Sequence, residues 1–193
     1  MNDIELEDDL MLLWKKLQNL RKGLRDYTKK KYNRVNPFNE DLFDWKEKGS
    51  FFGGLNVSIY DSSVISGDVS IGDNTWIGPF CSIDGTGGLK IGNYCAISTG
   101  VRILTHDSVK WALSGGKETY EYGPVNIGNF CFIGVESVIL RNINIGNNCI
   151  IGANSIVKNN VPDFSIVAGS PAKVIGRVEL NNDTVDLKYF NKY

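Results

Sequence analysis

Isoleucine returns at every sixth position over most of this chain. The series holds 14 positions, here called the anchors, of which 13 are Ile and the last is Val. The anchors are Ile59, Ile65, Ile71, Ile77, Ile83, Ile91, Ile97, Ile103, Ile127, Ile133, Ile139, Ile145, Ile151 and Val157. Because a period of six fits neither a helix of 3.6 residues per turn nor an alternating strand, the repeat must be explained by a larger unit of backbone.

A triangular column explains the period. Three six-residue sides with short strands make a coil of 18 residues, and coils stack about 4.8 Å apart through parallel hydrogen bonds. Fourteen anchors then predict an all-β solenoid of between four and five coils, with the anchor side chains facing inward. Glycine follows seven of the anchors, and we expect it there because it tolerates tight corner conformations.

The four cysteines lie in register with the anchors. Cys81, Cys95, Cys131 and Cys149 each follow an anchor by four residues, a small position that faces inward. A free Cys behaves there as a compact hydrophobe, and no Cys-x-x-Cys pair points to a metal. We therefore predict no metal site, no disulfide and no acyl-cysteine intermediate, since buried thiols are poor nucleophiles.

Charge and hydropathy exclude further classes. With 21 Lys and Arg against 22 Asp and Glu, the chain lacks the basic character of a nucleic-acid binder. No apolar run approaches the roughly 20 residues of a membrane span, and the acidic start does not resemble a secretory signal. We expect a cytoplasmic protein without a nucleic-acid partner.

Residues 1–50 lack the repeat and are predicted to form a helical arm. A spacing of three and four residues places six side chains on one helical stripe: Leu10, Leu13, Leu17, Leu20, Leu24 and Tyr27. We expect this amphipathic helix to pack on the column or on a neighbouring subunit; peripheral contact with a membrane surface is the alternative. The β-helix domain is predicted over residues 51–178, and residues 179–193 form a polar tail.

Only one histidine is present, and it lies where the repeat breaks. Twenty-four residues separate Ile103 from Ile127, where six would continue the coil. Residues 105–125 are therefore predicted to leave the column as a long loop, and such loops in compact folds are commonly functional. His106 stands at its start.

The repeats, over about residues 56–178, resemble those of the hexapeptide-repeat acyltransferases, especially the sugar and polysaccharide O-acetyltransferases. The resemblance implies a left-handed parallel β-helix, an exception to the right-handed crossover rule, and homotrimers with active sites between columns. In sugar acetyltransferases of this family a histidine at the departing loop is the general base, and the sequence Ile103 to Asp107 resembles that motif. A neutral imidazole can take the proton of an attacking hydroxyl; the alternative for His106 is a polar surface residue. The zinc site of γ-class carbonic anhydrases, which share the fold, needs three histidines and is excluded.

Asp84 is the first residue expected near His106. It follows Ile83, one coil before Ile103, and should therefore stack beneath Leu104. The segment around it resembles maltose and galactoside acetyltransferases, whose matching Asp contacts the acceptor. The alternative is a corner Asp that bonds to its own turn.

Three more residues are expected to contact the acceptor, and two to orient the imidazole. Phe132 stands where those acetyltransferases carry an acceptor-contacting Trp. Trp111 and Tyr120 of the loop offer flat faces to a sugar ring, or else anchor the loop to another subunit. Asp107 and Glu136 are candidates to orient the imidazole, with solvated corner residues as the alternative.

Residues 153–158 and 167–175 resemble the coenzyme A segment of the same family, in which the pantetheine arm lies along the column. The implied contacts are small corners and basic side chains that meet phosphates. These residues are Gly134, Gly152, Ala153, Lys158, Lys173 and Arg177.

The resemblance thus implies an acyltransferase that uses acetyl-CoA as co-substrate and acts on a hydroxyl of a sugar or oligosaccharide, belonging to a bacterial surface polysaccharide or its precursor. Transfer would be direct, in a ternary complex. Two alternatives stay open, namely N-acetylation of an amino sugar or a small xenobiotic, and a β-helix scaffold without catalytic activity.

Overall fold

The computed structural model describes residues 8–42, 44–182 and 184–190. They divide into two compact units, one ending at Asp44 and one beginning at Trp45. The first unit contains α1 (Asp8–Tyr32) and α2 (Phe38–Leu42), which contact each other. Among the residues described, none of the helices combines the length and the hydropathy that a bilayer crossing requires.

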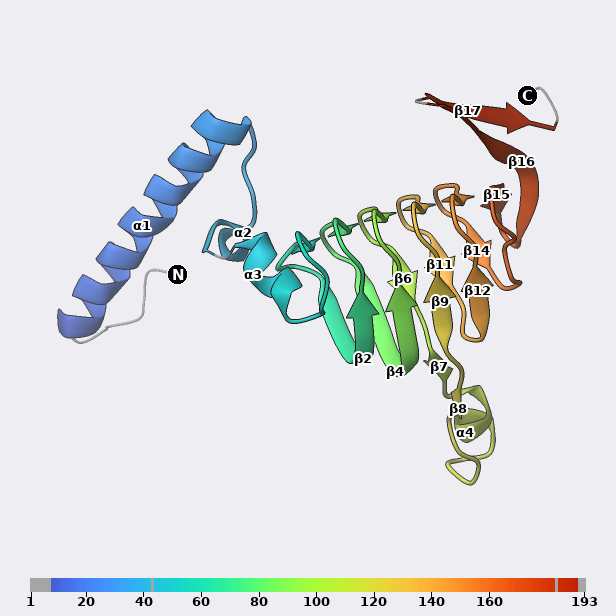
Figure 1. Ribbon diagram of the computed structural model, residues 1–193. Helices are drawn as coiled ribbons and strands as arrows, with labels where there is room; N and C mark the ends of the chain where they lie inside the picture. Colours follow the sequence, from blue (N-terminus) through green and yellow to red (C-terminus); the bar gives the residue numbers. More distant parts are fainter. Residues whose placement is uncertain (1–7, 43, 183, 191–193) are drawn as a thin grey trace. The chain divides into compact units, whose positions relative to one another are not determined.

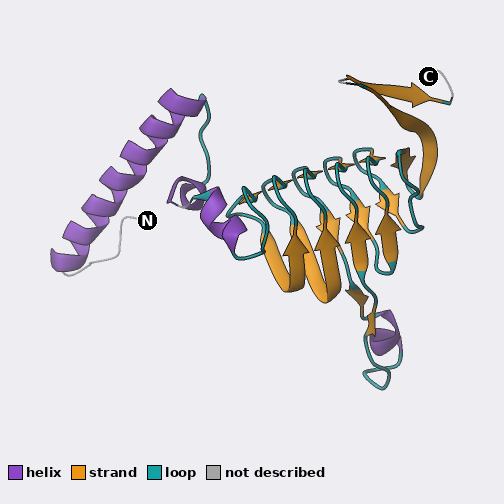
Figure 2. Cartoon of the chain, viewed as in Figure 1, coloured by secondary structure: helices purple, strands orange, loops and turns teal. Residues whose placement is uncertain are grey.

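The second unit is the column (Figures 1 and 2). Its elements, in chain order, are α3 (Trp45–Ser50), β1 (Ser58–Ile59), β2 (Val64–Ile71), β3 (Trp76–Ile77), β4 (Ser82–Ile91), β5 (Ala96–Ile97), β6 (Arg102–Ile103), β7 (His106–Asp107), α4 (Val109–Leu113), β8 (Glu121–Tyr122), β9 (Val125–Ile127), β10 (Phe132–Ile133), β11 (Val138–Ile139), β12 (Ile143–Ile145), β13 (Ile150–Ile151), β14 (Ile156–Val157), β15 (Ser165–Gly169), β16 (Ala172–Asn181) and β17 (Thr184–Tyr189).

Parallel strands stack along the sides of this column. One side stacks β1, β3, β5, β10, β13 and β15, and another stacks β2, β4, β6, β11 and β14. Anchors lie opposite anchors, so that Ile97 pairs with Ile133 and Ile133 with Ile151. The predicted left-handed parallel β-helix of hexapeptide repeats is confirmed.

The column has about six turns, more than the four to five that the anchors predict. The count was too low because the strict period ends at Val157 while the coil does not. Val161 bridges to Ile145, and Val167 pairs with Ile151. Both valines are buried, so they fill the interior of the column as the anchors do, although their spacing is irregular.

The core is the interior of the column. All anchors but Ile65 are at most 3% exposed, and Ile65 packs against the same cluster. The four cysteines are free and buried in it, and burial is the main cause that raises the pKa of the Cys81 thiol.

A ladder of side chains follows one corner from coil to coil. The Oδ1 atoms of Asn93, Asn129, Asn147 and Asp163 each accept a hydrogen bond from the backbone N–H of the preceding coil, at 2.7–2.9 Å. The residue after each rung, for example Phe130 at φ +58°, has left-handed backbone.

This corner corrects the expected role of glycine. The glycines after the anchors lack positive φ, and non-glycine residues adopt that conformation instead. A Cβ at Gly92 would lie 2.7 Å from the backbone of Gly128 in the next coil. Glycine is required because the coils approach closely.

The ends of the column are covered differently. At the start, the Lys48 ammonium donates to the carbonyl oxygens of Tyr60, Asp61 and Ser63 at 2.6–3.3 Å. At the end, β15 pairs with β16, and β16 with β17, both antiparallel. Residues 179–193, predicted to be a polar tail, include the end of β16 and all of β17.

Candidate active site

The carboxylate of Asp84 lies at a corner of the column with its side chain only 10% exposed. Its Oδ1 accepts hydrogen bonds from the backbone N–H and hydroxyl of Thr86, at 3.0 and 2.7 Å. Its Oδ2 accepts from the backbone N–H and hydroxyl of Thr105, at 2.8 and 2.9 Å. Both oxygens are thus fixed by the protein itself.

The imidazole of His106 meets this carboxylate. Its Nδ1 lies 2.7 Å from Asp84 Oδ2 and 2.9 Å from the Thr86 hydroxyl. A carboxylate only accepts hydrogen bonds, so this geometry assigns a proton to Nδ1. In the neutral ring Nε2 then carries the lone pair, which is the arrangement a general base needs.

The charge on Asp84 is stabilised although the group is buried. Burial by itself raises its pKa, but hydrogen bonds from Thr86, Thr105 and His106 outweigh it and leave the pKa well below the usual range. A permanently ionised carboxylate beside Nδ1 also stabilises the imidazolium that forms when Nε2 takes a proton.

The local sequence explains why the corner has this shape. The step from Ile83 to Ile91 is eight residues instead of six. The extra residues lie within β4, where its register with β2 shifts between Gly85 and Leu89, and Thr86 belongs to this irregular segment. The backbone N–H of Gly87 donates to the Thr105 hydroxyl at 2.8 Å. A Cβ at Gly87 would lie 2.3 Å from the Thr105 carbonyl oxygen, so only glycine fits.

The chain leaves the column after Thr105 and has rejoined it at Val125, which pairs with Leu89, and the segment between them is not a plain loop (Figure 1). Strands β7 and β8 pair antiparallel, and α4 lies between them in the chain. The backbone N–H of Gly123 donates to the Thr105 carbonyl at 2.8 Å and closes the base of this excursion.

Arg141 ties both strands of the excursion to the column. Its Nε donates to Asp107 on β7, and its terminal nitrogen donates to Glu121 on β8 at 2.7 Å. Lys110 adds an ion pair with Glu121 at 2.8 Å. The hydrogen bond from Arg141 is the main cause that lowers the pKa of Asp107.

Aromatic rings surround the imidazole. The ring of Tyr120 stacks on His106 with centroids 6.0 Å apart and an interplanar angle of 2°, and Tyr122 lies at 5.9 Å. Trp111 contacts Tyr120 edge-on at 5.7 Å. The structure thus brings Tyr120 to His106, and Trp111 to that site through Tyr120.

A pocket of about 310 Å³ opens beside this group. It is lined by Leu104, His106, Asp107, Leu140, Arg141 and Lys158. Strands β6, β11 and β14 pair in register, so Leu104, Leu140 and Lys158 are equivalent residues of successive coils. The pocket therefore has an apolar wall, an imidazole and an ammonium group.

Two predicted positions differ from the observed partners of the imidazole. Of the carboxylates expected to orient it, Asp107 pairs with Arg141, and Glu136 pairs with Arg102 at 3.1 Å. Asp84, expected to bind the acceptor, is the carboxylate that contacts His106. The positions of Asp84, Asp107 and Glu136 relative to the anchors place all three near the imidazole, but they do not show which carboxylate bonds to it.

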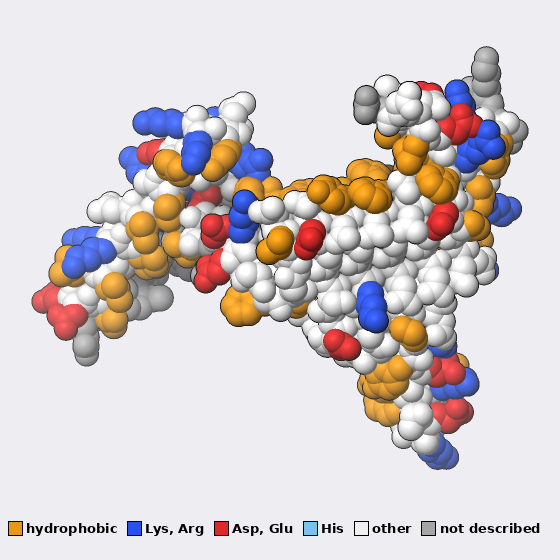
Figure 3. All heavy atoms as spheres, viewed as in Figure 1, with side chains coloured by type: hydrophobic (Ala, Val, Ile, Leu, Met, Phe, Trp, Pro, Cys, Tyr) orange, Lys and Arg blue, Asp and Glu red, His pale blue; other side chains and the backbone are white. Residues whose placement is uncertain are grey.

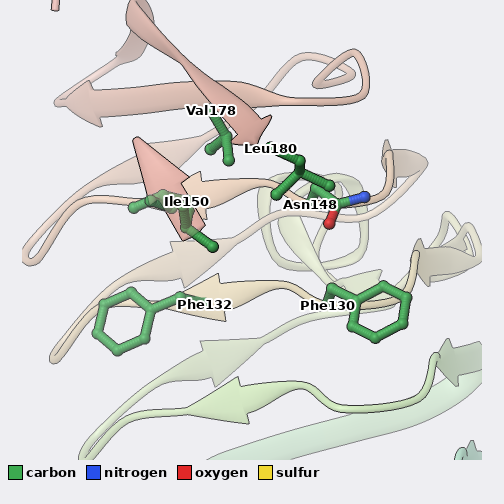
Figure 4. A pocket seen from close by; sticks show the side chains of 7 residues that line it. Phe130, Phe132, Asn148, Ile150, Val178 and Leu180 are labelled. Carbon is green, nitrogen blue, oxygen red and sulfur yellow. The ribbon is translucent and has the colours of Figure 1, made fainter. Parts of the chain in front are cut away.

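Phe132 lies away from this pocket. Its strand β10 belongs to the eight-stranded sheet, and it lines a separate groove of about 470 Å³ with Phe130, Ile150 and Val178 among others (Figure 4). Within one chain, Phe132 and His106 line different pockets.

The residues of the expected coenzyme A segment are spread over the last coils. Lys158 reaches the His106 pocket, whereas Lys173 is exposed on β16 and Arg177 pairs with Glu179. A Cβ at Gly134 would lie 2.5 Å from the backbone nitrogen of Ala153. The absence of a side chain at Gly134 therefore already follows from coil stacking; Gly152 is half-buried and Ala153 exposed.

Thr86, Thr105, Leu140 and Arg141 belong to the site and were not singled out from sequence. The eight-residue step points to Thr86, and the stacking count that paired Asp84 with Leu104 would also place Leu140. No sequence signal marks Arg141. Among the described residues, no group of three or more His, Cys, Asp or Glu side chains could hold a metal ion.

The chain matches known proteins in two segments. Residues 124–159 match the family described as bacterial transferase hexapeptide (six repeats), and residues 68–104 match the hexapeptide repeat of succinyl-transferase. A curated relative, Protein CapG of Staphylococcus aureus, is 46% identical over 92 residues, which are 47% of this chain and 54% of the relative. The chain thus matches about half the length of this relative.

Solved structures share the fold. A maltose O-acetyltransferase from Clostridium difficile 630 superposes with a TM-score of 0.60 at 22% identity, over 83% of this chain and 87% of the other. A hexapeptide-repeat acetyltransferase from Vibrio cholerae O1 biovar eltor, solved with acetyl coenzyme A, has a TM-score of 0.58 at 21% identity, over 84% and 88%. The N-acyltransferase AntD from Bacillus cereus has a TM-score of 0.58 at 22% identity, over 69% and 87%.

The repeats, their register and these matches agree with the resemblance seen in the sequence. Residues 68–104 and 124–159 thus carry hexapeptide repeats of the kind that these family models describe, and the chain shares the β-helix fold of the solved structures.

Proposed function

We propose that this chain is an acetyl-CoA-dependent O-acetyltransferase that acts on a sugar hydroxyl of a bacterial surface polysaccharide or its precursor. The observation that carries the proposal is the contact between Asp84 and Nδ1 of His106 at 2.7 Å. It leaves Nε2 as the free basic atom of a side chain that lines a pocket.

The reaction is a direct acyl transfer. The acceptor hydroxyl attacks the thioester carbonyl of acetyl-CoA while Nε2 of His106 takes the hydroxyl proton. The tetrahedral intermediate collapses, the carbon–sulfur bond breaks, and the thiolate of coenzyme A leaves and takes up a proton. Asp84 holds the imidazole in the required tautomer and balances its charge.

The acceptor would lie against the excursion. Tyr120 and Trp111 offer flat apolar faces of the kind that sugar rings pack on, and Tyr120 already stacks on His106. Phe132 would contact an acceptor only if another column placed it near this pocket.

Acetyl-CoA would run along the last coils. Lys158 lies in the same pocket as His106 and is the basic residue best placed to meet a phosphate or to guide the thioester. Lys173 and Arg177 are further candidates for the nucleotide phosphates, with Arg177 first having to leave Glu179. Gly134, Gly152 and Ala153 supply corners without large side chains.

We further infer a homotrimer in the cytoplasm. The groove beside Phe132 is lined almost wholly by apolar side chains, and Trp76 and Phe132 of the same sheet are exposed. Exposed apolar surface of this extent is typical of protein interfaces. Sedimentation equilibrium would measure the assembly state directly.

The test of the function is release of coenzyme A. The full chain is incubated with acetyl-CoA and a panel of oligosaccharides and nucleotide sugars, and wild type is compared with His106→Ala. Lys117→Gln, an exposed position of the same excursion, is the matched control. Saturable release that needs both an acceptor and His106 supports the proposal; release that is equal in His106→Ala overturns it.

Each sugar in the panel is paired with its amino analogue. Preference for the amine would favour N-acyl transfer, the activity named for AntD. A burst of acetylated protein without acceptor would contradict direct transfer. Absence of turnover across the panel together with absence of acetyl-CoA binding would favour the scaffold.

A further inference from the structure

Helix α1 leaves its apolar stripe exposed. The side chains of Leu10, Leu13, Leu17, Leu20 and Tyr27 are 40–62% exposed. They are five of the six side chains of the stripe that the sequence predicts to be buried, and the sixth, Leu24, is half-buried. Apolar side chains follow α1 in the surface view, with Lys and Arg side chains beside them (Figure 3). A contiguous exposed stripe of this kind marks a surface that binds something.

The net charge of α1 indicates the chemical class of a partner that would bind it. The helix has eight Lys and Arg against three Asp, a net charge of +5, while the whole chain has a net charge of −1. The remaining residues therefore carry −6. Such a strong excess in one helix favours an anionic partner.

The basic residues also border the stripe. At 100° per residue, Lys16 and Lys30 lie along one edge of the stripe, while Arg21 and Arg25 lie along the other. Long basic side chains at these positions can keep their charges in the headgroup layer while the stripe is buried. Trp14, at 46% exposed, is the residue type that prefers a membrane–water interface.

A second copy of the helix fits this surface less well. Two stripes brought together would place the lysines and arginines of both helices along the same seam. Like charges at such positions repel each other. An anionic lipid surface accepts the same charges favourably.

We propose that α1 lies on the surface of an anionic phospholipid membrane, with the leucine stripe in the headgroup region and the basic residues over the phosphates. This inference goes beyond the transfer reaction. It is tested by vesicle binding alone, so its failure and that of the transferase proposal are distinguishable.

The experiment is co-sedimentation of the full chain with lipid vesicles. One set contains phosphatidylcholine only, and the other contains about 30% phosphatidylglycerol. We expect binding to the anionic vesicles that weakens steeply as ionic strength rises from about 0.1 M to 1 M, where the screening length falls from about 10 to 3 Å. Equal binding to both sets, or none to the anionic set, overturns the proposal.

Paired variants locate the surface. Each lysine near an anionic membrane contributes about fivefold in partitioning, so Lys16→Gln/Lys30→Gln is expected to lower it about 30-fold. Leu13→Gln/Leu20→Gln is expected to lower it at least as much, because it removes buried apolar area. Lys90→Gln/Lys117→Gln removes the same charge from exposed positions of the column unit and should bind like wild type.

The controls complete the test. Far-UV circular dichroism and thermal melting establish that each variant folds; exposed positions should change neither. Loss of binding in Lys90→Gln/Lys117→Gln, or unchanged binding in both α1 variants, overturns the assignment to α1. So does an increase in mass without lipid that both α1 variants abolish, since it would assign the stripe to contact between copies.

Discussion

Two kinds of corner occur in the column, and their polar side chains are used differently. At the regular corner, Asn93, Asn129 and Asn147 bond the backbone of the neighbouring coil. At the irregular corner, Asp84 and Thr86 bond a side chain that can accept a proton. Where the period is kept, polar groups hold the fold together; where the chain departs from it, they become available for chemistry.

The largest expected effect separates the two corners by activity. His106→Ala removes the proposed base, so turnover should fall by about 10²–10⁴-fold. The melting temperature should change little, because the His106 side chain is 35% exposed. Coenzyme A release and thermal melting on the same preparation check both parts. Turnover retained in His106→Ala would mean that the irregular corner has no catalytic role that the regular corner lacks.

The converse variant lies in the regular coils. Ile133 is fully buried between Ile97 and Ile151, so Ile133→Ala should cost about 2–5 kcal/mol in the free energy of unfolding. Turnover per folded molecule should stay near wild type. Urea unfolding measures the first quantity, and a large loss of turnover in fully folded protein would contradict the second expectation.

Asp84→Asn tests the irregular corner through both properties. An amide in place of the carboxylate no longer fixes the tautomer or balances the imidazolium, and turnover should fall by up to about 10⁴-fold. The lowered pKa of Asp84 also means that its ionised form stabilises the fold above the unfolded-state value of about 3.9. This contribution is lost as the pH falls through that value toward the lower folded pKa.

Urea unfolding of wild type and Asp84→Asn at several pH values measures that difference. The difference in unfolding free energy between wild type and Asp84→Asn should be largest near pH 7. It should shrink progressively as the pH falls below about 4. A gap that widens on acidification would show that the ionised carboxylate is not the stabilising form.

Arg141→Gln loosens the excursion without touching the imidazole. Loss of the bonds to Asp107 and Glu121 should lower kcat/KM about tenfold, because the excursion carries Tyr120, which stacks on His106. Lys110→Gln, which removes only one pair with Glu121, is the milder comparison. If both variants lowered kcat/KM equally, Arg141 would contribute no more to the position of the excursion than the exposed Lys110.

The smallest expected effect belongs to the corner ladder. Asn129→Ala leaves the backbone N–H of Asn93 without its partner, which should cost about 1 kcal/mol in unfolding free energy. Turnover should not change. Hydrogen exchange at the backbone amide of Asn93 is the direct measurement. If Asn129→Ala left the protection of this amide unchanged, the ladder would not contribute to stability.

The repeat predicts the column because each anchor must be buried, and counting anchors places Asp84 beneath Leu104. The same count cannot rank Asp84, Asp107 and Glu136 as partners of His106, since side-chain direction at a corner depends on local backbone. The coil that closes on Val161 and Val167 breaks the period and was missed. The hairpin of β16 and β17 was also missed, although the residues from Thr184 to Tyr189 alternate between polar and apolar as a strand with one covered face does.

The excursion is joined to the column near its base, by the bond from Gly123 to Thr105 at 2.8 Å and by the ion pairs of Arg141 with Asp107 and Glu121. On either side of this bond the coils are in step, with Ile103 opposite Ile139 and Ile91 opposite Ile127. The tip around Gly115 and Gly116 can therefore be lengthened, shortened or exchanged without moving the imidazole. A single scaffold could in this way present the proposed base, His106, to acceptors of quite different size.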